Sequence, residues 1–266
     1  MISKNCLNCG KELTDRYCSG CGQEADTHRI SFRNFISHDL LHGTFHIERG
    51  MLFTARQALV RPGKAALDYI SGKRKRYYNV FYLILITTGL ILFFRHFYDQ
   101  IVISLGEEIV EKPAYINEAS RKMDEIFSQK SKFIIFLFVP FAALSSYVLF
   151  RRKKLNLSEH SIIAGMVLLG MLLISAFGHL FFYFDLIIEF NETFADIVNL
   201  AIPSLIVFQI GHGYWNAFRE DYTTIGISYR IGLFFAMLAL QALILLFLMI
   251  GYVSDWKFGA VHFNPY

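Results

Sequence analysis

The stretch from Ile162 to Phe184 reads IIAGMVLLGMLLISAFGHLFFYF, 23 residues without one charged side chain. As a helix it would be about 35 Å long, enough to cross the roughly 30 Å hydrocarbon core of a bilayer. Four other apolar runs reach the spanning range of about 17–25 residues; they are 79–98, 133–150, 197–218 and 231–253. The sequence therefore predicts an all-α integral membrane protein with about five transmembrane helices between residues 79 and 253.

Composition and charge support the same conclusion. Hydrophobic residues make up 54% of the 266 residues and charged residues 18%, against about 25% charged residues in typical soluble domains. If the N-terminus is cytoplasmic, the inner segments 1–78, 151–161 and 219–230 hold 19 of the 26 Lys and Arg residues. Cytoplasmic loops carry such an excess of bases. We therefore expect an N-in, C-out topology in the cell (inner) membrane.

The four cysteines form two Cys-x-x-Cys pairs near the N-terminus: Cys6, Cys9, Cys18 and Cys21. Four thiolates in two such pairs suit the tetrahedral, all-sulfur coordination of a structural zinc ion. Gly10 and Gly22 follow the pairs and allow tight knuckles whose N–H groups point at the sulfurs. The alternatives are redox dithiols or an iron–sulfur site, but a redox Cys-x-x-Cys normally belongs to a βαβ domain, for which the sequence has no pattern. Residues 1–28 are therefore predicted to be a zinc-ribbon-like head with a structural Zn²⁺.

The charge of this head argues against nucleic acid as a partner. Three bases stand against four acids in residues 1–28, a poor balance for a phosphate-binding surface. The N-terminus is polar and lacks the apolar core of a signal peptide, so we expect the cysteines to remain in the reducing cytosol. A protein-docking or autoregulatory module fits these properties better.

The remaining polar segments show helical periodicity. Residues 29–78 have apolar side chains at helical spacing, which predicts two or three amphipathic helices on the membrane or packed against it. The same spacing predicts an amphipathic helix in the outer loop 99–132. Residues 254–266 would then form a short outer tail.

A second candidate site lies in the juxtamembrane segment, at His38, Asp39 and His42. Histidines four residues apart share one face of a helix, so they could hold a metal or act as an acid–base pair. The alternative is that these are interfacial histidines whose polar tips lie among the lipid headgroups.

Polar residues inside the apolar runs are functional hypotheses by default; they are His179, Gln209, His212 and Gln241. Gln209 and Gln241 fall at a similar height in their helices, which predicts an interhelical hydrogen bond of about 0.6 kcal/mol. The alternative role for all four residues is ordinary interhelical packing.

A basic cluster and two tyrosines precede the first apolar run; they are Lys73, Arg74, Lys75, Arg76, Tyr77 and Tyr78. Bases near an anionic leaflet are attracted by about 1 kcal/mol each, and tyrosines anchor at the headgroup level. We therefore predict a topology-setting anchor here, with a lipid-headgroup site as the sharper alternative.

Four segments of the sequence resemble a known family; they are the cysteine knuckles at 6–10 and 17–23 and the segments 49–63 and 68–79. With these residues the chain resembles a bacterial membrane-protein family catalogued as domain of unknown function 3667. The resemblance covers residues 6–94. It implies a multi-pass membrane protein with a cytoplasmic zinc-ribbon-like head, and it brings no assigned activity.

Three functions compete. The first is a non-catalytic adaptor or regulator whose zinc head docks a cytosolic or membrane protein. The second is a transporter of small molecules or lipids, or a lipid-handling protein, motivated by the intramembrane polar residues. The third is a membrane enzyme that uses the juxtamembrane histidines. No catalytic phosphate loop, nucleophile elbow or His-Glu-x-x-His motif is present, so we favour the first, with membrane lipids and a protein as its partners.

Overall fold

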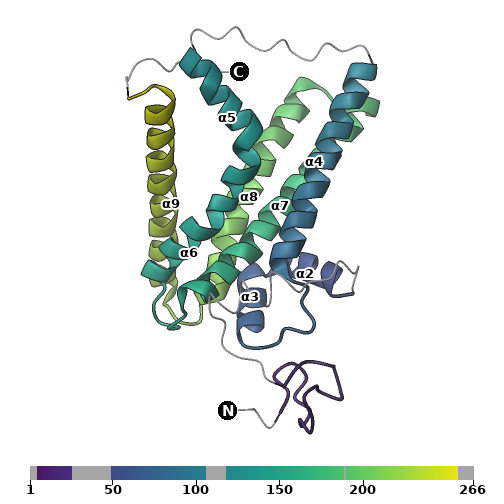
Figure 1. Ribbon diagram of the computed structural model, residues 1–266, viewed down its shortest axis with the longest axis vertical. Helices are drawn as coiled ribbons and strands as arrows, with labels where there is room; N and C mark the ends of the chain where they lie inside the picture. The colour runs from purple at the N-terminus through teal and green to yellow at the C-terminus, as the bar shows by residue number, and fades with distance from the viewer. Residues whose placement is uncertain (1–4, 26–48, 106–117, 189, 257–266) are drawn as a thin grey trace.

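The computed structural model describes residues 5–25, 49–105, 118–188 and 190–256, and over these ranges it contains helices and no strands (Figure 1). The helices, in chain order, are α2 (Arg49–Val60), α3 (Pro62–Ile70), α4 (Val80–Ser104), α5 (Glu118–Ile134), η2 (Ile135–Leu137), α6 (Phe138–Leu149), α7 (Leu157–Ile188), α8 (Glu192–Phe218) and α9 (Thr224–Val253). The predicted all-α class is confirmed for this part of the chain.

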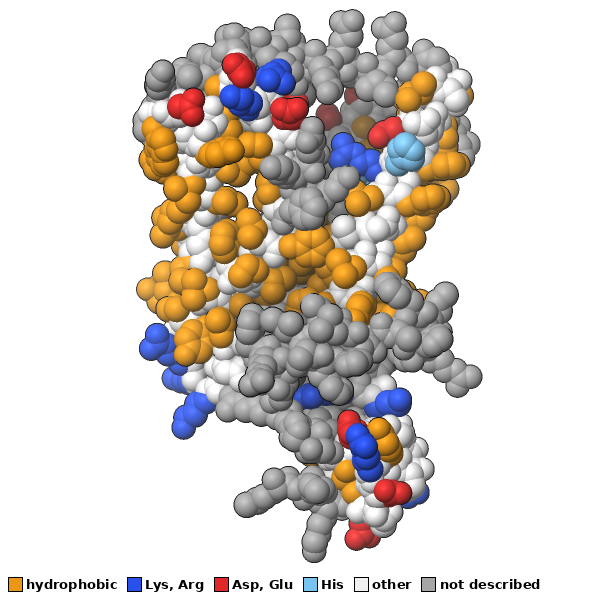
Figure 2. All heavy atoms as spheres, viewed as in Figure 1, with side chains coloured by type: hydrophobic (Ala, Val, Ile, Leu, Met, Phe, Trp, Pro, Cys, Tyr) orange, Lys and Arg blue, Asp and Glu red, His pale blue; other side chains and the backbone are white. Residues whose placement is uncertain are grey.

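Within the described ranges, four helices are long and apolar enough to cross a membrane: α4, α7 over Leu157–Phe184, α8 and α9. On the face shown in Figure 2, hydrophobic side chains form a broad band across the middle of the bundle, and charged side chains gather beyond both ends of this band. A band of this kind matches the hydrocarbon layer of a bilayer. The chain is therefore a membrane protein.

The apolar run 133–150 differs from the other predicted spans. It folds as η2 followed by α6, and its apolar helix, Ile135–Leu149, is shorter than the four long helices. Pro140 contributes to the break, because it has no N–H to donate to the carbonyl of Phe136 one turn earlier. The described part of the chain thus has four helices of spanning length and one short apolar helix.

Helix α7 lies at the centre of the bundle and packs against α2, α3, α4, α6 and α8. Its N-terminal half is buried almost completely, from Ile162 to Leu169. Aromatic rings fill the neighbouring space: Phe150 stacks on Phe218 with 4.4 Å between ring centroids, and Tyr214 lies 4.2 Å from Phe234. The core is therefore at the end of the bundle where α2 and α3 are attached.

Helices α2 and α3 lie at the head-facing end of the bundle, beside the start of α4 (Figure 1). Ala58, Ala65 and Ala66 are fully buried, because these small residues let α2 and α3 approach α7 and α8 closely. Gly63 is the tightest point, since a Cβ there would overlap the carbonyl oxygen of Gly213. The two juxtamembrane helices are thus part of the core of the protein.

Candidate metal centre

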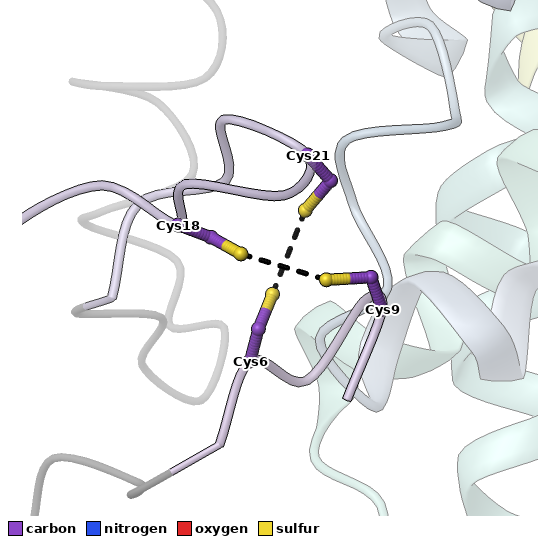
Figure 3. Close-up of side chains that lie close together, drawn as sticks. All are labelled: Cys6, Cys9, Cys18 and Cys21. Carbon is purple, nitrogen blue, oxygen red and sulfur yellow. Dashed lines mark hydrogen bonds between the residues drawn. The ribbon is translucent and has the colours of Figure 1, made fainter. Parts of the chain in front are cut away.

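The four cysteine side chains of the head converge on one point (Figure 3). Their Sγ atoms all lie within 4.8 Å of one another, with 3.6 Å between Cys6 and Cys21 and 3.5 Å between Cys9 and Cys18. A disulfide bond would need about 2.05 Å, and the cysteines are free. Tetrahedral coordination with metal–sulfur bonds of about 2.3 Å places the sulfurs about 3.8 Å apart. The four sulfurs therefore fit a single metal ion.

Two nearly identical backbone turns present these sulfurs. The Gly10 N–H donates to the Cys6 carbonyl and the Gly22 N–H donates to the Cys18 carbonyl, both at 2.8 Å. The two glycines have φ values of +78° and +71°, in the left-handed region that favours glycine. Equivalent residues lie twelve positions apart, at 6–12 and 18–24. The head is therefore an internal repeat of two knuckles.

The electrostatics of the centre favour a bound cation. Backbone N–H groups of Gly20 and Cys21 donate to the Cys18 sulfur and lower its pKa to about 6. At Cys9 an N–H from Lys11 favours the thiolate, but the Cys18 thiol, burial and the other two sulfurs outweigh it and raise the pKa to about 12. Thiolates are the metal-binding form of cysteine. Four adjacent sulfurs ionise together only when a positive ion offsets their charge.

The head contacts the loop between α3 and α4 through Gln23, which is only 6% exposed. The Gln23 Nε2 donates to the Gly72 carbonyl at 2.7 Å, and its Oε1 accepts from the backbone N–H groups of Arg74 and Lys75 at 3.2 Å each. Gly72 has a φ of +100°, and the Leu7 side chain occupies the space where a Cβ would lie. One amide thus fixes the main chain of this loop.

The sequence predictions did not single out Gln23. The twelve-residue repeat contains the signal that could have found it, because Gln23 occupies the position that Lys11 occupies in the first knuckle. Both positions make the same backbone hydrogen bond, to Cys18 and Cys6 respectively. Because Gln23 and Lys11 occupy equivalent positions but differ in side chain, the Gln23 side chain is expected to have a role outside the metal centre.

The predicted basic anchor is divided between internal contacts and solvent. The Lys73 ammonium lies 2.7 Å from Asp68, and the Arg74 guanidinium lies 5.6 Å from the centroid of the Tyr69 ring. Lys75 and Arg76 are exposed. Lys73 and Arg74 therefore hold the loop on α3, whereas the side chains of Lys75 and Arg76 are largely exposed, with the Arg76 guanidinium 5.8 Å from the centroid of the Tyr77 ring.

The sequence predicted that the two tyrosines of this anchor lie at the headgroup level, but the structure buries them in the protein. Tyr77 and Tyr78 are buried; the Tyr77 hydroxyl donates to Asp68 at 3.2 Å, and the Tyr78 N–H donates to the Thr54 hydroxyl at 2.8 Å. Burial and the Asp68 carboxylate raise the pKa of Tyr77 to about 12. Asp68 attracts Lys73 and the two hydrogen bonds fold the loop inward, which buries both rings.

The polar residues of α8 form hydrogen bonds with backbone groups that lack helical partners where the chain breaks between α2 and α3. Pro62 has no N–H, so it cannot donate to the carbonyl of Ala58, four residues earlier. The Gln209 Nε2 replaces that donor at 2.7 Å from Ala58 O and also lies 3.1 Å from Leu59 O. Gly170 of α7 leaves room for this contact, because a Cβ there would come within 2.6 Å of both Ala58 O and the Gln209 amide.

Two further residues of α8 continue this contact along the same helix face. The His212 Nε2–H donates to the Val60 carbonyl at 3.0 Å, and the Asn216 Oδ1 accepts from the Lys64 N–H at 2.9 Å. In an unbroken helix the Lys64 N–H would donate to Val60 itself. Side chains of α8 therefore satisfy both halves of this missing helical hydrogen bond. Asn216 was not predicted, although it lies one turn from His212 and two turns from Gln209.

The prediction of a hydrogen bond between Gln209 and Gln241 is wrong. Gln209 binds the α2 carbonyls, and the Gln241 Oε1 accepts from the Ser145 hydroxyl at 3.3 Å instead. A similar height in two helices does not by itself bring two side chains together, and α9 packs on α6, which brings Gln241 to a different neighbour. His179 is partly buried on α7. His38, Asp39 and His42 lie outside the described residues.

Helices of spanning length, joined to a four-cysteine head that fits a metal ion, define a membrane protein with a candidate metal-binding module. Residues 48–93, which include α2, α3 and the first half of α4, match the family described as Protein of unknown function (DUF3667). The family resemblance drawn from the sequence is thereby confirmed. No curated protein and no solved structure matches the chain.

Proposed function

We propose that this protein is a non-catalytic membrane adaptor or regulator whose head carries a structural Zn²⁺ and docks a protein partner. The observation that carries the proposal is the convergence of four cysteine sulfurs on one point. Catalytic zinc sites keep one coordination position open for water or substrate, whereas structural sites are closed by four protein ligands. A centre closed by four sulfurs supports a folding role for the metal.

The small size of the head supports the same role. Among its described residues, the buried apolar side chains are those of Cys6 and Cys18. A segment with so little apolar core obtains its folding free energy from the metal. Zinc is the ion we propose, because soft thiolate ligands in tetrahedral geometry favour it.

We propose five spans, with the head on the cytoplasmic side of the cell (inner) membrane and the C-terminus outside. The loops 71–79 and 150–156 lie at the head-facing end of the bundle (Figure 1), and each contains four bases. Lys and Arg in short loops mark the cytoplasmic side. The apolar helix Ile135–Leu149 would be the fifth span. Membrane lipids are then partners by location, and no nucleic acid is expected.

Tyr17 is the residue of the head best suited to a protein partner. It is 54% exposed, and the Arg16 guanidinium lies 5.6 Å from the centroid of its ring. Arg16 is held in turn by Glu24 at 3.3 Å. Tyr and Arg are the residue types enriched where protein interfaces gain most of their binding energy. An exposed Tyr–Arg pair that is held by Glu24 beside the second knuckle therefore supports docking at this face.

The alternative functions receive less support from the described residues. A transporter or lipid-handling role was motivated by polar residues inside the spans, but Gln209 and His212 are bound to α2 carbonyls and Gln241 is bound to Ser145. These contacts support a structural role for three of the four polar residues, Gln209, His212 and Gln241. The membrane-enzyme alternative depends on His38, Asp39 and His42, which lie outside the described residues.

The proposal is tested by purifying the full-length protein from native membranes, measuring its metal content and identifying the proteins that co-purify. We expect one zinc per chain in the wild type and in Tyr17→Ala. Cys9→Ser should lose the zinc, and both variants should lose the same co-purifying protein. Lys11→Ala, a change of an exposed head residue whose side chain lies over Gly20, is the matched control and should keep both.

Two outcomes would contradict the proposal. If the wild-type protein contained no stoichiometric zinc, the proposed metal centre would be ruled out. If Cys9→Ser and Tyr17→Ala retained the same co-purifying proteins as the wild type, the proposed docking role would be ruled out, even with zinc present in the wild type.

A further inference from the structure

The face of the head formed by Leu7, Gly22 and Gln23 binds the α3–α4 loop through its main chain. Gln23 contacts one carbonyl and two N–H groups of residues 72–75. Gly22 lies against the stem of Lys75, because a Cβ added to this glycine would lie 3.8 Å from the Lys75 Cε atom. The face therefore recognises the shape of a turn, independently of the charges on its side chains.

The turn that it recognises requires glycine at one position. Gly72 has a φ of +100°, and a Cβ there would come within 2.6 Å of the Leu7 Cδ1 atom. On its other side the loop is held by α3, where Asp68 pairs with Lys73. The loop is thus clamped between the head and α3, and the head accepts the hydrogen bonds from Arg74 and Lys75.

The metal centre and this face share their backbone. The Gln23 carbonyl accepts from the Cys18 N–H at 2.8 Å, and the Gln23 N–H donates to the Cys21 sulfur. The orientation of the Gln23 side chain therefore depends on the second knuckle, which in turn depends on the sulfurs being held together. Lys11 makes the same backbone hydrogen bond in the first knuckle, but its side chain lies over Gly20.

We propose that this face is a metal-dependent docking surface whose ligand is residues 72–75 of the same chain. With the metal bound, Gln23 holds the loop; with the metal removed, the head releases the loop while the helical bundle stays folded. The loop runs through Tyr78 to Asn79, whose side chain caps the N-terminus of α4. Metal occupancy in the head thereby controls the order of the segment that enters the first long helix. This inference rests on the proposed metal centre.

Hydrogen–deuterium exchange on the purified full-length protein tests the inference directly. The amides of Arg74 and Lys75 donate to Gln23, and loss of such bonds raises the exchange rate of the amides concerned. We expect exchange at residues 74 and 75 to become about tenfold faster in Gln23→Ala and in wild-type protein treated with a zinc chelator. Peptides from α7 should keep their wild-type rates.

Lys11→Ala is the matched control, because Lys11 is the equivalent residue of the other knuckle and its side chain lies over Gly20 of the head. This variant should keep its zinc and its wild-type exchange at residues 74 and 75. A second measurement uses trypsin, which should cleave after Lys73 to Arg76 faster in the chelated protein and in Gln23→Ala than in Lys11→Ala.

The outcomes separate this inference from the proposed function. Wild-type exchange at residues 74 and 75 in a zinc-loaded Gln23→Ala protein would overturn the docking surface and leave the metal centre intact. Unchanged exchange after measured removal of the zinc would overturn the metal dependence. Absence of zinc from the wild-type protein would instead overturn the proposed metal centre itself.

Discussion

The contact between Gln209 and the α2–α3 break makes the sharpest prediction about stability. Gln209→Leu keeps the approximate size of the side chain and removes the amide that donates to Ala58 and Leu59. Interhelical hydrogen bonds in membrane proteins contribute about 0.6 kcal/mol on average and at most about 1.7 kcal/mol. Two such bonds to one amide predict a loss of roughly 1–3 kcal/mol in the free energy of unfolding.

Pro62→Ala provides a way to isolate this contribution. Alanine restores an N–H four residues after Ala58, so the helix itself can then satisfy the Ala58 carbonyl. Gln209→Leu should therefore cost about 0.5–1.5 kcal/mol less in the Pro62→Ala background than in the wild type. A double-mutant cycle cancels the packing change caused by loss of the proline ring, because that change is present in both arms of the comparison.

The measurement is reversible unfolding of the purified protein in mixed detergent micelles, followed by loss of helical signal. Ser204→Ala is the control, since Ser204 lies on an exposed face of the same helix and its hydroxyl donates to the Leu200 carbonyl one turn earlier. Additive effects of Gln209→Leu and Pro62→Ala, within about 0.3 kcal/mol, would refute the idea that Gln209 replaces the missing proline N–H.

Three further predictions concern single positions. Gly63→Ala should destabilise the protein by about 1–3 kcal/mol, because its Cβ would overlap the Gly213 carbonyl, whereas Gly232→Ala, with open space around it, should be neutral or stabilising in the same unfolding assay. Gly72→Ala should release the head, because the loop needs φ near +100° and Leu7 fills the side-chain space; wild-type exchange rates at residues 74 and 75 would contradict this. Burial alone would raise the pKa of Asp68, but the hydrogen bond and charge of Lys73 and the hydrogen bond from Tyr77 outweigh it and lower that pKa. Asp68 therefore stabilises the fold above the ordinary aspartate pKa of about 3.9, and this contribution disappears as the pH falls through its lowered native pKa. The wild type should consequently lose more stability than Asp68→Asn on titration from about pH 6 to about pH 3, and equal losses would show that the carboxylate contributes nothing.

The sequence predicts the long helices and the cysteine centre well, for physical reasons that are local. A run such as 162–184 is apolar over the full thickness of a bilayer, whatever surrounds it. The cysteine pairs are close in the chain, so their spacing alone places their sulfurs near one another. Both features require little knowledge of how distant segments pack.

Features that depend on distant packing were missed or misassigned. Gln209 reaches α2 because Pro62 leaves a carbonyl there without its helical donor, and the two residues are far apart in the sequence. Tyr77 and Tyr78 are residues of the type that anchors at a membrane surface, but hydrogen bonds to Asp68 and Thr54 hold them inside the protein. In each case a hydrogen-bonding group on another segment determines where the residue lies.

The contacts of α8 also have a consequence for biosynthesis. Ala58 and Gln209 are 151 residues apart, and ribosomes add about 5–20 residues per second. The carbonyls at the α2–α3 break are therefore made about 8–30 s before the side chain that satisfies them. During that interval the corner must stay in contact with water at the surface of the membrane. Its closure onto the bundle is then a late step of insertion, triggered by the arrival of α8.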